Sequence, residues 1–380
     1  MDKYKKINGP INIIRIEGQI FGHNKILYLF LDKHYQIQQQ TKCQDYLSDD
    51  VVVYLNREFH KIENKYIDFF VETAVEDKVI ESYDIYKDRY IDEVIKFFYK
   101  YIKKHNNKNL GTSISNHIRF HYVDIRNYTR EYFSKYFDKL NNLYNSYILR
   151  KGIEQIKPEY QLKNSTKIIN KLISNIETLI LIVNKPNVND NDKKLLKINY
   201  IIDKILNKYQ HHELKKYVKD LMNIFIHKLN NLKRKLIILR DNSNLILKII
   251  KDSHDDIKLN AIMKESNLII DELSHDNIET FCWIMDIYFL RRLLDKDYIT
   301  HCVAYTGGAH SLEYIYFLVR NFNFKITHAS KINGKKNIDV INDELKNNRK
   351  LTVDYLWDIF LAENEILQCS DISSFPDNFD

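Results

Sequence analysis

The stretch HCVAYTGGAH, residues 301–310, joins an apolar run directly to two glycines and a histidine. Residues 301–305 have the length and composition of a buried β-strand, and a helical pattern follows from Gly308 to about residue 321. A strand that passes straight into a helix is typical of the β-α-β units that build parallel sheets. We therefore expect His310 to lie just beyond the carboxyl end of a strand in such a sheet.

The first third of the chain has the same alternation of short apolar runs and helical patterns. Helices are expected over residues 51–62 and 88–104, where apolar residues recur at helical spacing. Strands are expected over residues 11–16, 26–31, 66–72 and 118–123, and a further strand over residues 324–328. The sequence predicts an α/β fold with a mostly parallel central sheet flanked by helices.

A long middle segment, residues 128–273, contains apolar residues almost entirely at helical spacing and very little glycine. It predicts a large all-helical insertion without a repeat period, which argues against a solenoid. The expected helices cover residues 128–149, 167–183, 193–209, 213–239 and 243–250, with a loop at 187–192. The expected organisation is a first half of the α/β core at 1–127, the insertion at 128–273, a second half at 274–362, and a loosely ordered polar tail at 363–380.

Composition excludes several broad classes of protein. With 44% hydrophobic residues among 380, the chain is too apolar to be disordered. Its 58 basic residues against 51 acidic ones give a net charge of only +7, and the basic runs are short, which indicates solvated helix or loop faces. The cysteines Cys43, Cys282, Cys302 and Cys369 lie far apart without a C-x-x-C pair, so we expect reduced, mostly buried thiols.

Side chains that can bind a metal ion follow two of the predicted strands. His34 comes shortly after the strand at 26–31, with Asp32 beside it, and His310 follows the strand at 301–305. Ligands of parallel α/β sheets bind outside the carboxyl ends of the strands, so both imidazoles can reach one site. Two imidazoles and a carboxylate are a standard donor set for a catalytic divalent ion, so we expect His34, His310 and Asp32 to bind Mn, Co or Zn.

Three other residues at strand ends are candidates for catalysis: Glu72, Asp124 and Arg126. A carboxylate beside a metal site can act as a base or orient a ligand, and an arginine can clamp an anion through its planar fork. Glu76 is a substitute for Glu72. Structural explanations stay open, because His34 and His310 could shape turns, Glu72 could be a solvated strand terminus, and Asp124 with Arg126 could form a structural ion pair.

The motifs GGAH at 307–310, LDKH at 31–34 and FHYVDIR at 120–126 carry a family resemblance. The chain resembles the TraB/TIKI superfamily, with its ChaN-like and erythromycin-esterase-like relatives, which has two G-x-x-H elements at strand ends and an acidic residue after an intervening strand. GGAH matches the second element, whereas LDKH has leucine where the family has glycine. Proteins of large DNA viruses with AT-rich genomes share this layout. The resemblance covers roughly residues 11–126 and 278–328 and implies a metal-dependent hydrolase.

Two functional hypotheses follow. The first is a metal-dependent hydrolase that uses metal-activated water against an amide or ester bond of a small-molecule or peptide substrate. The second, which Leu31 favours, is a catalytically inactive viral structural or interaction protein, with the lysine-rich helical insertion as a surface for nucleic acid. Motifs of serine hydrolases, P-loop NTPases and Rossmann dehydrogenases are absent from the sequence. Without a signal peptide or an uncharged run of membrane-spanning length, the expected location is the host cytoplasm or the virion interior, with no secretion and no membrane contact.

Overall fold

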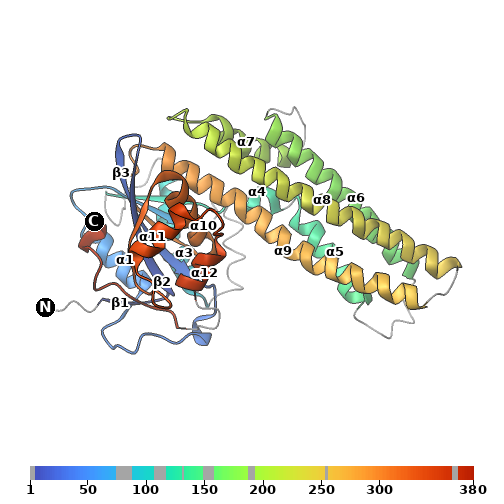
Figure 1. Cartoon of the computed structure of the whole chain (residues 1–380), viewed down its shortest axis with the longest axis horizontal. Helices are drawn as coiled ribbons and strands as arrows, with labels where there is room; N and C mark the ends of the chain where they lie inside the picture. The colour runs from blue at the N-terminus through green and yellow to red at the C-terminus, as the bar shows by residue number, and fades with distance from the viewer. Residues whose placement is uncertain are drawn as a thin grey trace. The chain divides into compact units, whose positions relative to one another are not determined.

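The computed structural model describes residues 5–73, 88–106, 117–130, 132–148, 158–186, 193–252, 256–361 and 367–380 (Figure 1). The chain divides into two compact units, which we describe separately. Unit 1 comprises residues 1–124 and 292–380, and unit 2 comprises residues 125–291. The change into unit 2 falls close to the expected one after residue 127. The return to unit 1 falls later than residue 274, because the helix that contains this position continues to Asp295.

Unit 1 contains, within its described residues, a six-stranded sheet in the order β6-β5-β7-β3-β2-β8. β6, β5, β7 and β3 pair in parallel, whereas β2 runs antiparallel to both β3 and β8. The strands are β2 (Asn12–Ile20), β3 (His23–Asp32), β5 (Ile67–Val71), β6 (Ile118–Tyr122), β7 (His301–Gly307) and β8 (Lys325–Ala329). The predicted fold class, a mostly parallel α/β sheet flanked by helices, is confirmed.

The connections of the two adjacent strands β3 and β7 leave in opposite directions. β3 is followed by α1 (Val51–His60) and then by β5, which lies beyond β7. β7 is followed by α10 (Gly308–Phe322) and then by β8, which lies beyond β2 on the other side. In open α/β sheets, ligand sites form where the strand order reverses in this way, outside the carboxyl ends of the strands.

Helices cover both faces of the sheet. On one face, α1 and α3 (Tyr90–Asn106) pack their apolar sides against Phe30, Phe69 and Tyr305 in a single buried cluster. α10 contributes no residue to this cluster but contacts β2, β3, β7 and β8, so it covers the opposite face. Side chains of a strand point alternately to the two faces of the sheet. Because helices cover both faces, these strands are apolar on both sides. α11 (Ile338–Asn347) and α12 (Asp354–Phe360) lie against α10 (Figure 1).

The end of the chain is ordered, contrary to the expectation of a loose tail after residue 363. Residues 363–366 of the tail lie outside the described ranges, but β9 (Cys369–Asp371) pairs with β1 (Lys6–Asn8), which also pairs with β4 (Asp49–Asp50). Phe375 and Phe379 are buried in the apolar cluster of unit 1, the latter at the end of the short 3-10 helix η2 (Asp377–Phe379). The expectation was wrong because it was based on the polar composition of the tail and did not consider these two buried aromatic residues.

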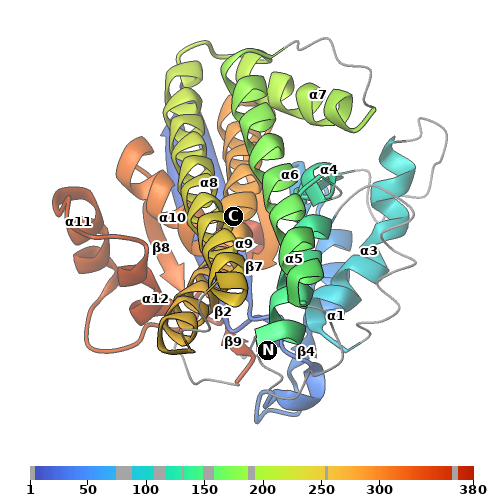
Figure 2. The same ribbon diagram turned by 90° about the vertical axis from the view of Figure 1, so that its right-hand side faces the viewer.

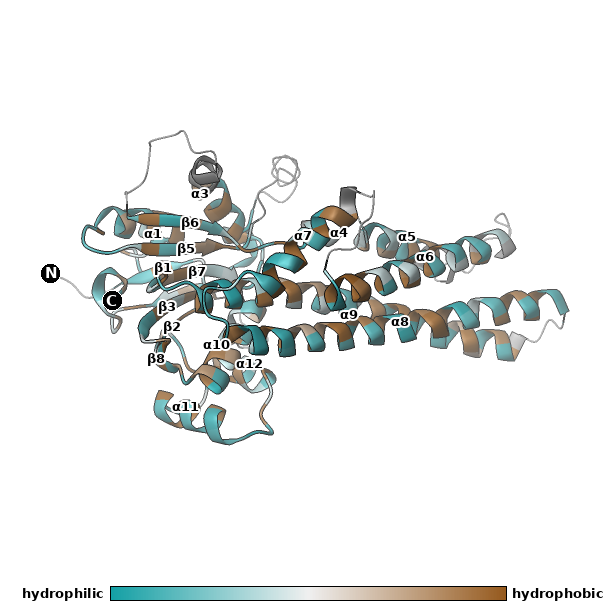
Figure 3. Ribbon diagram, turned by 90° about the horizontal axis from the view of Figure 1, so that it is seen from above, coloured by the Kyte–Doolittle hydropathy of each residue, from teal (hydrophilic) through white to brown (hydrophobic). Residues whose placement is uncertain are grey.

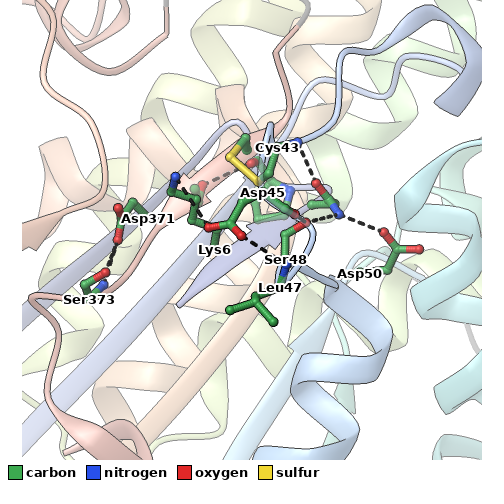
Figure 4. The surroundings of a disulfide bond; sticks show 12 residues. Lys6, Cys43, Asp45, Leu47, Ser48, Asp50, Asp371 and Ser373 are labelled. Atoms are coloured by element: carbon green, nitrogen blue, oxygen red, sulfur yellow. Dashed lines mark hydrogen bonds and ion pairs between the residues drawn. A yellow bond between two sulfur atoms is a disulfide. The ribbon is translucent and has the colours of Figure 1, made fainter. Parts of the chain in front are cut away.

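The expectation of reduced thiols is wrong for two of the four cysteines. Cys43 and Cys369 form a disulfide, and Figure 4 shows it among polar side chains of Lys6, Asp45 and Ser48. Asn8 of β1 pairs with Cys369 of β9 and its side chain accepts a hydrogen bond from the N–H of Cys43. The two cysteines therefore meet across a sequence separation of 326 residues, which no spacing motif can reveal. The segment that begins at His34 and includes η1 (Ile37–Gln39) is thereby attached to the chain end, and a bridge between Thr41 and Leu367 adds a second attachment.

Unit 2 is helical, as the apolar spacing predicts. α5, α6, α8 and α9 run alongside one another (Figure 2), and their hydropathy alternates along each helix (Figure 3). The helices are α4 (Asn127–Arg130), α5 (Ser134–Ile148), α6 (Pro158–Asn184), α7 (Lys193–Asn207), α8 (Leu214–Asp252) and α9 (Asp256–Asp295). The predicted break between residues 239 and 243 is wrong, because buried Leu239 and Ser243 continue the apolar stripe of α8 through the polar residues between them. The predicted loop at 187–192 lies outside the described residues.

None of the helices in the described ranges combines the length and the apolar character needed to cross a membrane.

Candidate functional site

Four of the predicted site residues meet at the carboxyl ends of three adjacent strands of unit 1. Asp32 ends β3 and His34 follows it, Glu72 follows β5, and His310 lies in the first turn of α10 after β7. Because β7 lies between β5 and β3, its end brings the other two strand ends within reach of one another. The structure thus brings Asp32, His34, Glu72 and His310 together.

The carboxylate of Glu72 lies between the two imidazoles. Its Oε2 atom is 3.6 Å from His34 Nε2, and its Oε1 atom is 3.7 Å from His310 Nε2. The backbone N–H of Gly307 donates a hydrogen bond of 2.7 Å to Oε2 and fixes the orientation of the carboxylate. Glu72 and His310 are buried, whereas the side chain of His34 is 34% exposed, so solvent reaches the cluster at His34.

Asp32 lies on the other side of the His34 ring and is buried. Its Oδ1 atom accepts a hydrogen bond from the backbone N–H of His34 and lies 3.1 Å from Nδ1 of the same residue. Its Oδ2 atom accepts a hydrogen bond of 2.7 Å from the hydroxyl of Tyr305. Sequence reasoning missed Tyr305, because a tyrosine in an apolar strand looks like any other core aromatic residue.

The left-handed backbone conformation at this site belongs to His34, which has φ of +58°. Leu31, where the resembled family has glycine, is a buried residue of β3 paired with Thr306 and is not among the described residues with positive φ. A non-glycine residue with positive φ costs about 1–2 kcal/mol, so the surroundings of His34 must hold it there. The backbone conformation at position 31 therefore does not require glycine.

Gly307 leaves the space in which the cluster fits. A Cβ atom at this position would lie 2.8 Å from His34 Nε2 and 3.4 Å from Glu72 Oε2. Its φ of −52° is open to any residue, so the requirement for glycine comes from close approach and not from the backbone conformation. The second glycine, Gly308, would instead bring a Cβ to 3.0 Å from the Leu361 side chain.

The acidic surroundings control the protonation of His34. Burial lowers its pKa, but the carboxylates of Asp32 and Glu72, 3.1 Å and 3.6 Å from its two ring nitrogens, outweigh burial and raise the pKa to about 10. Burial, together with the charge of Asp32, raises the pKa of the Tyr305 hydroxyl well above its usual value, so this hydroxyl keeps its proton and acts as a donor to Asp32.

Asp124 and Arg126, the remaining predicted site residues, fall in different units. Asp124 is buried at the end of unit 1, where its backbone N–H donates to the carbonyl of Thr73. Arg126 belongs to unit 2, where its Nη1 atom lies 3.4 Å from the sulfur of Cys282. We do not include either residue in the cluster. Glu76 lies outside the described residues.

A second group of potential ligands lies on α9 in unit 2. Among the described residues, only His275, Asp276 and Glu279 place one donor atom each within 4.8 Å of one another. Lys235 lies 2.8 Å from Asp276, and Lys228 pairs with Glu279, so lysines already neutralise both carboxylates. We read this group as an ion-paired helix face.

The donors at the strand ends fit a divalent ion in kind. Two imidazoles and a carboxylate match the preferences of Zn and of Mn or Co, and the absent Cβ of Gly307 keeps the space beside His34 Nε2 and Glu72 clear. The Nε2 atoms of His34 and His310 lie 3.6 Å and 3.7 Å from the Glu72 carboxylate, which are the distances of histidine–carboxylate ion pairs. Glu72 presents a different oxygen to each imidazole.

The fold and the cluster define a class: an α/β protein with a histidine–carboxylate site at the point where its strand order reverses. The chain belongs to the family described as a family of unknown function, DUF5847, which matches residues 5–380. Three relatives from Acanthamoeba polyphaga mimivirus cover nearly the whole chain. Uncharacterized protein R161 is 32% identical over 98% of both chains, and uncharacterized proteins R706 and R160 are each 30% identical over 99% of this chain and 97% of their own.

No solved structure matches the chain. The resemblance to the TraB/TIKI superfamily stays a prediction.

Proposed function

We propose that the protein is a metal-dependent hydrolase of the TraB/TIKI type, which cleaves an amide or ester bond of a small-molecule or peptide substrate. The observation that carries this proposal is the position of Glu72, whose carboxylate lies between His34 and His310. Since the relatives are mimivirus proteins, we further infer that the chain is a giant-virus protein that acts in the host cytoplasm or in the virion interior.

In this proposal His34 and His310 hold a Mn, Co or Zn ion through their Nε2 atoms, and Glu72 supplies the carboxylate. When bound, such an ion polarises the scissile carbonyl and lowers the pKa of a water molecule to about 7. Asp32, which the sequence predicts to be a ligand, accepts a hydrogen bond from Tyr305 on one oxygen and a hydrogen bond from the N–H of His34 on the other. We therefore assign Asp32 to the support of His34 instead.

Each protein group has a separate task in this arrangement. The Gly307 N–H holds the Glu72 carboxylate in place, so Glu72 reaches both imidazoles without rearranging. His34 is the member of the cluster that solvent reaches, and a substrate would approach from its side. The cluster binds a cation only after the proton on His34 leaves, because a protonated imidazole has no free lone pair.

The alternative of a nucleic-acid-binding interaction protein has less support. Two of the three basic residues at 233–235 form ion pairs: Lys233 lies 2.6 Å from Glu177, and Lys235 lies 2.7 Å from Glu272. Lys336 similarly lies 2.7 Å from Glu344. Paired lysines contribute little to phosphate binding, which depends on a surplus of positive charge.

Titration of the purified protein with Mn, Co and Zn, followed by calorimetry and elemental analysis, tests the proposal. We expect about one equivalent bound to the wild type and none to His310→Ala or His34→Ala, each checked for folding by circular dichroism. His23→Ala is the matched control, since His23 is an exposed histidine of β3 at the far end from the cluster. Absence of binding in the wild type, or equal binding in all four proteins, would refute the metal site.

A further inference from the structure

Tyr305 brings a hydroxyl group into the apolar core of unit 1 directly beneath the site. The residue is completely buried in β7, and its ring lies 6.2 Å from that of Phe30 in the aromatic cluster. A buried hydroxyl without a hydrogen bond costs free energy, and this one donates to Asp32 Oδ2 at 2.7 Å. A phenylalanine could pack in this cluster without a hydroxyl. The role of the Tyr305 hydroxyl is therefore its hydrogen bond to Asp32.

Asp32 is a carboxylate with very little exposure, since its side chain is 1% exposed. Within the described part of the chain, no lysine or arginine forms an ion pair with it. Its contacts are the Tyr305 hydroxyl on Oδ2, and the backbone N–H and ring Nδ1 of His34 on Oδ1. The Tyr305 hydrogen bond therefore fixes the plane of the carboxylate that faces His34.

His34 depends on this support for two reasons. Its backbone has the unfavourable φ of +58°, and the bond from its N–H to Asp32 helps to hold that conformation. Its ring lies between two carboxylates, with Nδ1 3.1 Å from Asp32 as a charge contact and not a hydrogen bond, and with Nε2 3.6 Å from Glu72. The position of Asp32 therefore acts on His34 through the bond to its backbone N–H and through its charge beside Nδ1.

We propose that Tyr305 is a positioning residue, which orients Asp32 so that Asp32 holds the ring of His34 with Nε2 toward Glu72 and His310. The proposal deepens the proposed function and rests on it as far as His34 is a metal ligand. Its geometric part, the control of His34 by Tyr305 through Asp32, is independent of any metal. Partners that support metal-bound histidines in this way typically change metal affinity by about 10- to 100-fold.

The test compares Tyr305→Phe with Tyr54→Phe. Both tyrosines belong to the same aromatic cluster and flank Phe30, at 6.2 Å and 6.5 Å between ring centroids. Loss of the Tyr54 hydroxyl therefore controls for a general effect on the core. Protein labelled with ¹⁵N-histidine reports the protonation and tautomer of the His34 ring, with the His34 signals assigned from a His34→Gln variant.

We expect Tyr305→Phe to shift the ¹⁵N signals of His34 and to weaken cation binding by about 10- to 100-fold. Tyr54→Phe should leave both properties as in the wild type, and Asp32→Asn should shift the His34 signals further than Tyr305→Phe, because it also removes the charge beside the ring. Unchanged His34 signals in Tyr305→Phe would overturn the positioning role. If the wild type binds no cation but the His34 signals still respond to Tyr305→Phe, the metal site is refuted while the positioning role is retained.

Discussion

The Nε2 atom of His34 lies 3.6 Å from the Oε2 atom of Glu72, although the strands that these residues follow do not pair with each other. β7 lies between β3 and β5 and ends at Gly307, whose N–H binds the same carboxylate oxygen. Contact between His34 and Glu72 is possible because Gly307 has no side chain at the end of the intervening strand. The absence of a side chain at Gly307 therefore allows His34 and Glu72 to approach each other across the end of β7.

Replacement of Gly307 by alanine should disrupt this contact at little cost to the fold. The new Cβ would lie 2.8 Å from His34 Nε2, closer than real Cβ atoms approach, while its backbone conformation suits alanine. We expect a loss of cation affinity of at least about 10-fold, measured by calorimetry. Gly308→Ala is the control, because its Cβ would meet the Leu361 side chain instead of the cluster. Equal affinities in the two variants would contradict the role of Gly307.

Restoring the glycine of the resembled family at position 31 should harm the protein. Leu31 is fully buried in a regular strand, so Leu31→Gly removes a core side chain and adds backbone freedom. We expect unfolding in urea to show a loss of about 3–5 kcal/mol, with no gain in cation affinity. A stable Leu31→Gly variant with tighter binding would show instead that leucine obstructs the site.

Acid should destabilise unit 1 through His121. This buried histidine contacts Asp68 at 2.6 Å and stacks on Phe70, and burial lowers its pKa to about 4 despite the nearby carboxylate. The folded pKa lies below the value of about 6.5 in the unfolded chain, so stability from this group is complete above pH 6.5 and is lost as the pH falls toward 4. The loss amounts to about 3 kcal/mol by linkage.

Urea unfolding of the wild type and of His121→Gln at several pH values between 7 and 4 measures this contribution. The variant keeps a donor for Asp68 but has no titratable ring, so it should lose less stability in acid by about 3 kcal/mol. Parallel pH profiles for the two proteins would show that His121 is not the group responsible.

The number of free thiols should distinguish the disulfide from the reduced state expected from the sequence. Alkylation of the denatured, unreduced protein should label Cys282 and Cys302 only, and prior reduction should add Cys43 and Cys369. Reduction should also lower the free energy of unfolding by about 2–5 kcal/mol, since the bridge closes a very long loop. Labelling of all four cysteines without reduction, read by mass spectrometry, would exclude the bridge.

Sequence alone was sufficient for the features that local periodicity and strand punctuation encode. The apolar runs located the segments that form the parallel strands, and apolar residues at helical spacing located the helical unit. His34 and His310 were found because each follows a strand, and parallel strands end at a common edge. The bounds of α8 differ from the expected ones, because apolar spacing does not fix helix ends where polar turns can continue a helix.

Tertiary structure decided which strands are neighbours, and with that which distant side chains touch. The insertion of β7 between β3 and β5, the hydrogen bond from Tyr305 to Asp32, and the bridge from Cys43 to Cys369 all join segments far apart in the chain. Periodicity in a sequence records whether a side chain faces the core, but it does not record which partner that side chain meets there. That choice depends on strand order and register, which arise only when the whole sheet forms.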